Sequence, residues 1–433
     1  MNFVDVFRAA WNEPDLRQRI LFIFLIFGIY AIGIHIQVPI GNIDPNLITQ
    51  KLQQSGVLEM INMFTGGALR RLSIFALGLN PYITASIIMQ LVTVAIPSLK
   101  KEMMEGGQYE RMRRAQRTRA LTLVLCAFQG WGFLTLLTQG IPLSAWEKVQ
   151  IVVLWTAGAM FVLWLGEQIQ EKGIGQGVSL MIFAGIVVSF PIQTAAVIQQ
   201  VREGTMAIWR VVALFGIFVL LTGLIVFFTQ AQRRIMIQHM RRTAGAKMLV
   251  GGSSYLPIPV NAAGVIPIIF AVTLLYLPAQ IAQWFPPGSW MGELFSNIAI
   301  YFNPRPGAFW YQWLTGTIIY ALLIFFFTYF YTAVQYNVEE IAGHLKRSGA
   351  YIPGVRQGKQ TEQFLDQVIS RITAVGAFFL AFVSLVPYWI PQITGVAQFS
   401  FLGSTSLLII VSVVLDLMRQ IEANLIMKGY SRA

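Results

Sequence analysis

The 433-residue sequence has few charges, few histidines and almost no cysteine, and each shortage excludes a class of protein. Charged residues make up 12% of the chain, about half of the roughly 25% found in soluble domains. The one cysteine, Cys126, has no second cysteine with which to bond, so a disulfide scaffold is excluded. His35, His239 and His344 lie far apart without the spacing of metal ligands, so we expect no metal site and no haem.

Apolar residues are abundant, at 56% of the chain with a mean hydropathy of +0.62. A soluble core cannot bury that much apolar surface, so lipid must be the solvent for much of the chain, and an ordinary cytosolic enzyme is excluded. Ten runs without Lys, Arg, Asp or Glu have roughly the 17 to 25 residues that cross a bilayer. They are 20–36, 73–96, 120–139, 149–166, 178–198, 211–231, 260–283, 313–335, 372–393 and 399–415.

The basic residues predict the orientation of these ten spans. If both termini are cytoplasmic, the cytoplasmic segments carry 24 of the 31 lysines and arginines, and the opposite side carries 7. Basic residues favour the cytoplasmic side of a membrane. We therefore expect a multi-pass protein of the cytoplasmic membrane (the inner membrane of a cell with two) whose termini both lie in the cytoplasm.

Three of the cytoplasmic connections, 97–119, 232–259 and 336–371, are long and basic. Glycines and prolines in the last two suggest ordered structure, and 232–259 has the pattern of a hairpin. One interpretation is that these charges only set the topology. The other is that the loops project as docking sites for a large anionic partner such as ribosomal RNA, or for a motor protein.

A short internal repeat suggests duplication. The pattern Gly-x-x-Pro-x-Ile begins at Gly78 and again at Gly264, five spans later. An odd number of spans would make halves 1–205 and 206–433 inverted repeats, a common plan of transport proteins. Ordinary helix starts would also explain glycine and proline at these places.

The segment 57–72 is amphipathic, rich in methionine and interrupted by Gly66-Gly67. Even as a continuous helix it would be at most about 24 Å long, too short to cross the membrane. Such a segment lies on the surface or re-enters the protein, where irregular backbone is tolerated if it is buried. Its direct continuation into the next span favours re-entry.

The sequence offers no catalytic or cofactor site. Gly354-Val355-Arg356-Gln357-Gly358-Lys359-Gln360 resembles a phosphate loop but has three residues between the glycines and ends in Gln, so we expect no nucleotide hydrolysis and no cofactor. None of the ten span cores carries a charge. This counts against an inverted-repeat secondary transporter of small solutes, the alternative function, and against an intramembrane enzyme. It favours a pore closed by aliphatic side chains.

Several motifs closely resemble those of the bacterial SecY family, the central subunit of the protein-conducting channel. The resemblance extends from the first span to the last. The runs that carry it include Met63-Phe64-Thr65-Gly66-Gly67-Ala68-Leu69, Pro81-Tyr82-Ile83-Thr84-Ala85-Ser86, Trp164-Leu165-Gly166-Glu167, Tyr255-Leu256-Pro257-Ile258 and Gly349-Ala350-Tyr351-Ile352-Pro353-Gly354-Val355-Arg356.

The resemblance implies an all-α membrane protein with ten transmembrane helices in two pseudo-symmetric, inverted-repeat halves of five, and a re-entrant plug helix. By similarity, 57–72 is the plug, with Met60, Ile61, Asn62, Met63, Phe64, Thr65, Gly66 and Gly67. The pore ring would consist of Leu79, Ile83, Val178, Ile182, Ile269 and Ile409. Such a ring can yield around a passing chain because it makes no directional bonds.

The resemblance also implies a lateral gate, docking loops and partners. Gln90, Gln129 and Asn261 would help to hold the gate closed, although ordinary helix packing explains them equally well. SecA or the ribosome would dock at Arg241, Arg242, Lys247 and Arg356, and many relatives have two basic residues where this chain has Ala246-Lys247. SecE and SecG are the expected membrane partners. Signal peptides and unfolded polypeptides would be the substrates, with membrane lipids receiving transmembrane segments.

Overall fold

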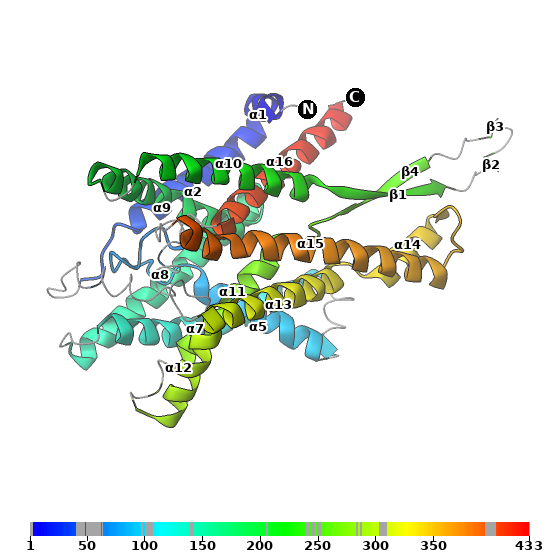
Figure 1. Cartoon of the computed structure of the whole chain (residues 1–433). Coiled ribbons are helices and arrows are strands. Elements are labelled where there is room, and N and C mark those ends of the chain that lie inside the picture. Colours follow the sequence, from blue (N-terminus) through cyan, green and yellow to red (C-terminus); the bar gives the residue numbers. More distant parts are fainter. Residues whose placement is uncertain are drawn as a thin grey trace.

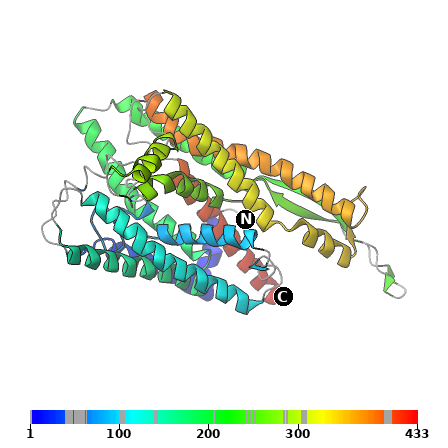
Figure 2. The ribbon, with the colours of Figure 1, turned by 90° about the horizontal axis from the view of Figure 1, so that it is seen from below.

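The computed structural model describes residues 3–39, 48, 62, 64–96, 98–99, 107–138, 143–204, 207–239, 243–244, 247–248, 253–282, 285, 288–302, 310–394 and 404–432. Its long helices lie side by side, and a β-hairpin projects beyond their ends (Figure 1, Figure 2). Both termini lie on the same side of the molecule, where helix α1 contacts helix α16.

A helix overlaps each of the ten predicted spans. These helices are α2 (Pro14–Gly33), α5 (Asn80–Ala95), α7 (Gln108–Leu137), α8 (Ala145–Lys172), α9 (Gly177–Arg202), α10 (Ile208–Gln230), α11 (Ile266–Ala282), α13 (Trp310–Gln335), α15 (Lys359–Thr394) and α16 (Ser404–Arg432). By length and apolar composition, six helices in the described residues qualify as spans on their own. Helices α5 and α11 are shorter, at 16 and 17 residues.

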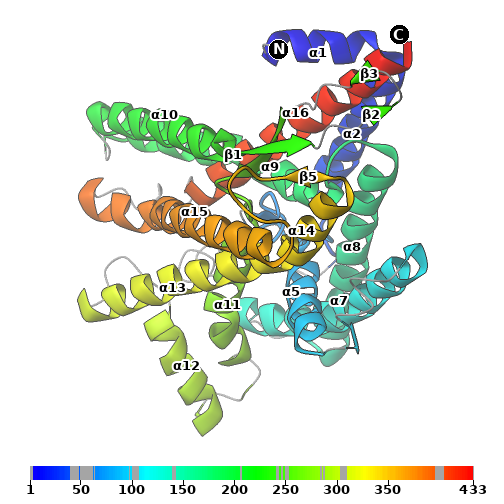
Figure 3. The ribbon, with the colours of Figure 1, turned by 90° about the vertical axis from the view of Figure 1, so that its right-hand side faces the viewer.

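Within the described residues, three further helices lie outside the predicted spans: α1 (Phe3–Asn12), α12 (Trp290–Phe302) and α14 (Val338–Arg347). Seen from the side on which the hairpin projects, α2, α5, α7 and α8 lie to the right, and α10, α12, α13 and α15 lie to the left (Figure 3). Helix α16 contacts α9 as well as α10 and α15, and α5 contacts α11. The two groups of helices therefore meet along α5 and α11 and are bridged by α16.

Helices α5 and α11 begin later than the apolar runs predict. Residues 74–79 and 260–265 are turns. In both places a glycine with positive φ, Gly78 at 52° and Gly264 at 66°, precedes the helix by two residues, and proline is its second residue. Glycine adopts this left-handed conformation without strain, and proline fits the first turn of a helix. The Gly-x-x-Pro repeat therefore has the same local structure in both copies.

The hairpin predicted in 232–259 is present. Strand β1 (Gln232–His239) pairs antiparallel with β4 (Ser253–Pro259), and β2 (Thr243–Ala244) pairs with β3 (Lys247–Met248) near the tip. A strand from the other long loop, β5 (Ala350–Tyr351), pairs with β1 and completes the order β4-β1-β5. Ile235, Ile258, Ile352, Leu365 and Ile369 form a separate apolar core beneath this sheet. The two loops are therefore one folded unit.

Candidate functional site

The six aliphatic residues expected to form a ring come together in the structure. Leu79 directly precedes α5 and Ile83 lies in its first turn, while Val178 and Ile182 lie in the first two turns of α9. Ile269 lies in the first turn of α11, and Ile409 in the second turn of α16. All six belong to or pack against one apolar cluster. The beginnings of four helices thus meet at one place.

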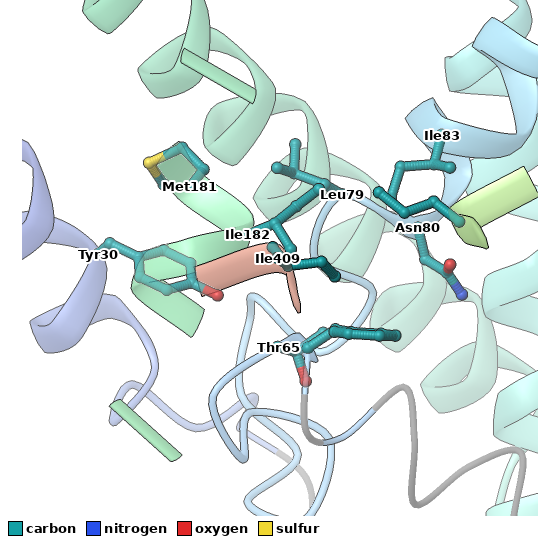
Figure 4. A pocket seen from close by; sticks show the side chains of 10 residues that line it. Tyr30, Thr65, Leu79, Asn80, Ile83, Met181, Ile182 and Ile409 are labelled. Carbon is teal, nitrogen blue, oxygen red and sulfur yellow. The ribbon is translucent and has the colours of Figure 1, made fainter. Parts of the chain in front are cut away.

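Five of the six line a small cavity of about 30 Å³, enough for one or two water molecules. Leu79, Ile182 and Ile409 lie close together at its centre, and Ile83 lies to one side (Figure 4). Val178 packs against the same cluster without lining the cavity. These side chains offer no hydrogen bond to water or ions, so the constriction resists hydration.

The cavity is also lined by residues that the sequence did not point to. These are Tyr30, Asn80 and Met181, and the expected plug residues Phe64 and Thr65 complete the wall. Tyr30 is 2% exposed and stacks on Phe75, with ring centroids 5.9 Å apart. Sequence position alone cannot identify these contacts because they depend on how the helices are placed.

The segment 65–79 re-enters the protein as a series of turns around a single bridge at Ser73. Of the eight expected plug residues, Asn62, Phe64, Thr65, Gly66 and Gly67 are described, and Met60, Ile61 and Met63 lie outside the described residues. The Asn62 carbonyl accepts from the Gly67 N–H at 2.7 Å, and its Oδ1 accepts from the Arg70 N–H at 2.8 Å. Asn62 therefore organises the turn that contains the two glycines.

The second part of the re-entrant segment is firmly held. The Ile74 N–H donates to the Ile36 carbonyl at 3.0 Å, the Val38 N–H to the Leu72 carbonyl at 3.0 Å, and the Ser73 hydroxyl to the Gly33 carbonyl at 2.8 Å. These bonds satisfy buried backbone groups that a non-helical chain would otherwise leave unpaired.

Three helix glycines give the segment room to approach. A Cβ added at Gly33 of α2 would overlap the Phe75 ring, and one at Gly158 of α8 would overlap the Ile74 carbonyl. A Cβ at Gly185 of α9 would overlap the Phe64 carbonyl. Sequence reasoning missed these glycines, and the only signal was a small residue within an apolar run.

The three amides expected at the lateral gate lie at separate places and do not contact one another. Gln129 Nε2 of α7 lies 3.4 Å from Thr84 Oγ1 of α5, so this contact joins two helices on the same side of the seam. Gln90 of α5 lines a second cavity. Asn261 lies in the turn before α11, is 8% exposed, and its amide atoms have no partner within the described part of the chain.

The expected docking residues lie on the projecting unit. Arg356 is exposed in the loop between β5 and α15, where its carbonyl accepts from the Thr361 hydroxyl at 2.9 Å. Lys247 lies in β3 at the hairpin tip, whereas Arg241 and Arg242 lie outside the described residues. The Tyr351 hydroxyl donates to Gln238 Oε1 at 2.9 Å and joins the two loops.

The electrostatics of the described residues are simple. Beneath the sheet, burial raises the pKa of the Tyr336 phenol, which therefore stays neutral at physiological pH. Arg119 Nε lies 2.7 Å from Glu167 Oε1, joining α7 to α8. Among the described residues, no three His, Cys, Asp or Glu side chains gather as metal ligands would.

The sequence is similar to that of known proteins over nearly its whole length. The SecY family model matches residues 73–418. Protein translocase subunit SecY of Escherichia coli strain K12 is 39% identical over 440 residues, covering 99% of this chain and 96% of that protein. Protein translocase subunit SecY of Thermotoga maritima is 40% identical over 438 residues, with 98% and 96% covered.

Solved structures share the fold. A structure described as a protein-conducting channel matches with a TM-score of 0.66 at 18% identity, covering 93% of this chain and 91% of that chain. A SecY structure reported for its plug domain matches with a TM-score of 0.63 at 19% identity and the same coverage. Sec61 in the canine ribosome–channel complex from the endoplasmic reticulum matches with a TM-score of 0.63 at 17% identity, again with 93% and 91% covered.

Proposed function

The chain belongs to the SecY family, and we infer that it is the central pore-forming subunit of a protein translocase. It is a multi-pass membrane protein that provides a channel for polypeptides. The observation that supports this most directly is the ring, because four helices bring aliphatic side chains to one narrow cavity. The alternative, a secondary transporter of small solutes, is not supported, because relatives that align over nearly the whole chain are translocase subunits.

We propose that the six-residue ring seals the resting pore and stretches around a passing chain. Aliphatic contacts are not directional, so they can re-form around side chains of any kind, and their apolar surface excludes ions. The re-entrant segment would block the pore on one side of this ring, since Phe64 and Thr65 already line the cavity beneath it. In one structural relative the plug domain is described as stabilising the closed state of the channel and maintaining a membrane seal.

We propose that the chain opens sideways between α5 and α7 on one side and α11 and α13 on the other. Residues 1–205 and 206–433 would be the two halves that part. Signal peptides and nascent transmembrane segments would leave through this seam into lipid. Apolar contacts between α5 and α11 would help to hold this seam closed. Hydrogen bonds made by Gln90 and Asn261 across the seam would add about 1 kcal/mol each, whereas the contact of Gln129 with Thr84 stays on one side of it.

We also propose the orientation and the partners. Both termini and the projecting sheet would lie in the cytoplasm, as the distribution of basic residues favours. The exposed Arg356, with Lys247, Arg241 and Arg242 at the hairpin, would receive SecA or the ribosome, and these partners would supply the energy. SecE and SecG would complete the complex in the cytoplasmic membrane. The chain itself would act without catalysis or cofactor.

Crosslinking of a stalled secretory chain tests the pore role. Ile83→Cys and Ile269→Cys are each expected to crosslink to a polypeptide that is arrested during export, because both positions line the cavity. Val153→Cys, on an exposed face of α8, is the control and is expected to give no crosslink. Crosslinking at Val153 but not at Ile83 or Ile269 would contradict the proposed path.

A further inference from the structure

A side-chain contact joins the chain just after α2 to the re-entrant segment. Arg71 Nη1 lies 2.6 Å from His35 Nε2, and His35 Nδ1 lies 2.8 Å from the Ala31 carbonyl oxygen. A guanidinium only donates hydrogen bonds and a carbonyl only accepts them, so Nε2 is the acceptor and Nδ1 the donor. His35 is therefore a neutral imidazole whose proton is on Nδ1.

The residue that follows Arg71 has a strained backbone. Leu72 has a φ of 47°, and among the described residues it is the one non-glycine with a positive φ. A side chain with a Cβ disfavours this left-handed conformation, which persists only where the surrounding structure holds it. After Leu72, the Ser73 hydroxyl donates to the Gly33 carbonyl at 2.8 Å. Before it, the contact of Arg71 with His35 holds the other end of the turn.

Protonation of His35 would break this contact. Histidine is the side chain that ordinarily changes charge between about pH 5 and 8, and His35 is exposed, so protons from water reach it. The added proton would lie on Nε2 and face the Arg71 guanidinium, so an acceptor would become a donor and two positive charges would meet. Protons therefore favour the separated pair. The contact stabilises the segment at neutral pH and is lost as the pH falls.

The charges around the pair do not offset this repulsion. Among the described residues, none of the ion pairs includes His35 or Arg71. Arg70, which is exposed beside Arg71, adds positive charge. Helix α8 packs against α2, and its charged residues near this end are Glu147, which is bonded within the cap of its own helix, and Lys148.

We propose that His35 and Arg71 form a pH-sensitive clamp that positions the re-entrant segment. The neutral pair holds the strained turn at Leu72 and, with it, the backbone bonds between residues 36–38 and 72–74. Acid on the side of the membrane that His35 faces, the outer side in the proposed orientation, would release the clamp and loosen the segment. The clamp itself needs only the observed contacts, whereas its effect on the seal rests on the proposed function of the plug.

Hydrogen exchange of the purified complex, followed by mass spectrometry, tests the clamp directly. The readout is a peptide that contains Ile74, whose N–H donates to the Ile36 carbonyl at 3.0 Å. At about pH 5 we expect this amide to exchange about fivefold faster in the unaltered chain than in His35→Gln, which stays uncharged, because one exposed charged contact contributes about that factor. At about pH 7.5 the unaltered chain is expected to exchange no faster than His35→Gln.

Further variants separate a clamp from a merely structural role. Arg71→Lys keeps a positively charged donor and is expected to keep the pH response, whereas Arg71→Leu removes the repulsion and is expected to abolish it. His344→Gln replaces an exposed histidine of α14 and is the matched control, expected to respond to pH as the unaltered chain does. The same pH response in His35→Gln as in the unaltered chain would overturn the proposal, and so would a full response in Arg71→Leu.

The resting conductance of planar bilayers then separates the clamp from the plug. Acidifying the outer side alone is expected to raise the conductance of the unaltered chain and to leave that of His35→Gln unchanged. A pH response in hydrogen exchange without one in conductance would support the clamp and contradict the sealing role of the plug.

Discussion

At the scale of single residues, the region around the ring depends on two kinds of residue, large aliphatic ones and glycine. Leu79, Ile182 and Ile409 are 7%, 7% and 3% exposed, and their bulk fills the constriction. Glycine does the opposite at Gly158 and Gly185, where the missing Cβ leaves space for the backbone of the re-entrant segment. Large residues therefore fill the constriction, and the smallest residue leaves room for the re-entrant segment beside it.

Gly158→Ala tests the second role. The added Cβ would overlap the Ile74 carbonyl, and because a backbone atom cannot rotate away, α8 or the segment must shift. We expect a loss of about 1–3 kcal/mol in stability, typical of overpacking, seen as a lower unfolding midpoint of the purified complex. Gly216→Ala in α10, where a Cβ meets nothing within 4 Å, is the control and is expected to leave the midpoint unchanged or raise it. Equal midpoints for both variants would contradict this account.

At the scale of elements, the re-entrant segment has two parts. The part after Gly67 is fixed in the core by burial and hydrogen bonds, and the part before it ends at the pair Gly66-Gly67. Ala68, Leu69 and Ser73 are completely buried, and hydrogen bonds fix 72–74 against 36–38. Before them, Gly66 and Gly67 have φ values of 70° and 85°, which allow a sharp change of direction. A displacement of the plug would therefore leave the part after Gly67 in place.

Deleting residues 60–67 is expected to make the resting membrane permeable to ions. The deletion removes Phe64 and Thr65 from the cavity wall while keeping Ala68 and Leu69 in the core. Without residues 60–67, only the narrow ring would resist hydration, so the apolar barrier that ions must cross would be shorter. Conductance of planar bilayers containing the purified complex measures this. A resting conductance equal to that of the unaltered chain would argue against a sealing role.

The projecting sheet is the other element with a functional proposal. Arg356→Glu reverses a charge on an exposed loop whose backbone is held by the Thr361 hydroxyl. We expect motor-driven export into reconstituted vesicles to slow roughly tenfold, corresponding to about 1.4 kcal/mol of weaker docking. Lys359→Glu, exposed at the start of α15, is the control for charge reversal near the site. Export that is slowed as much by Lys359→Glu, or not slowed by Arg356→Glu, would count against docking at Arg356.

At the scale of the whole molecule, the apolar cores do not follow the order of the chain. The cluster around the ring joins residues of α2, α8 and α9 to Ile409, Val413 and Ile421 of α16. A second cluster joins α5, α7 and α8 to α10, α11, α13 and α15. The first and last spans therefore belong to the same apolar cluster, and the ring is complete only when α16 has joined the helices before it.

The orientation of the whole molecule can be measured by thiol labelling of intact cells. A membrane-impermeant reagent is expected to label Glu203→Cys, between α9 and α10, from outside, and Ser253→Cys, in the hairpin, only after lysis. Both positions are exposed, whereas Cys126 is completely buried and serves as the unreactive background. Labelling of Ser253→Cys in intact cells would reverse the proposed topology.

The sequence by itself predicted a helix at each of the ten apolar runs, and the hairpin, because apolar run length and turn residues act locally. The family resemblance named the six aliphatic residues, which the structure brings together, although their role in a pore stays a prediction. Only the tertiary structure decided that α5 and α11 begin at Asn80 and Ile266, since uncharged turns and helices have the same hydropathy. It alone revealed the glycines that accommodate residues 64–79 and the contact between His35 and Arg71, because both arise where segments that lie far apart in the sequence meet.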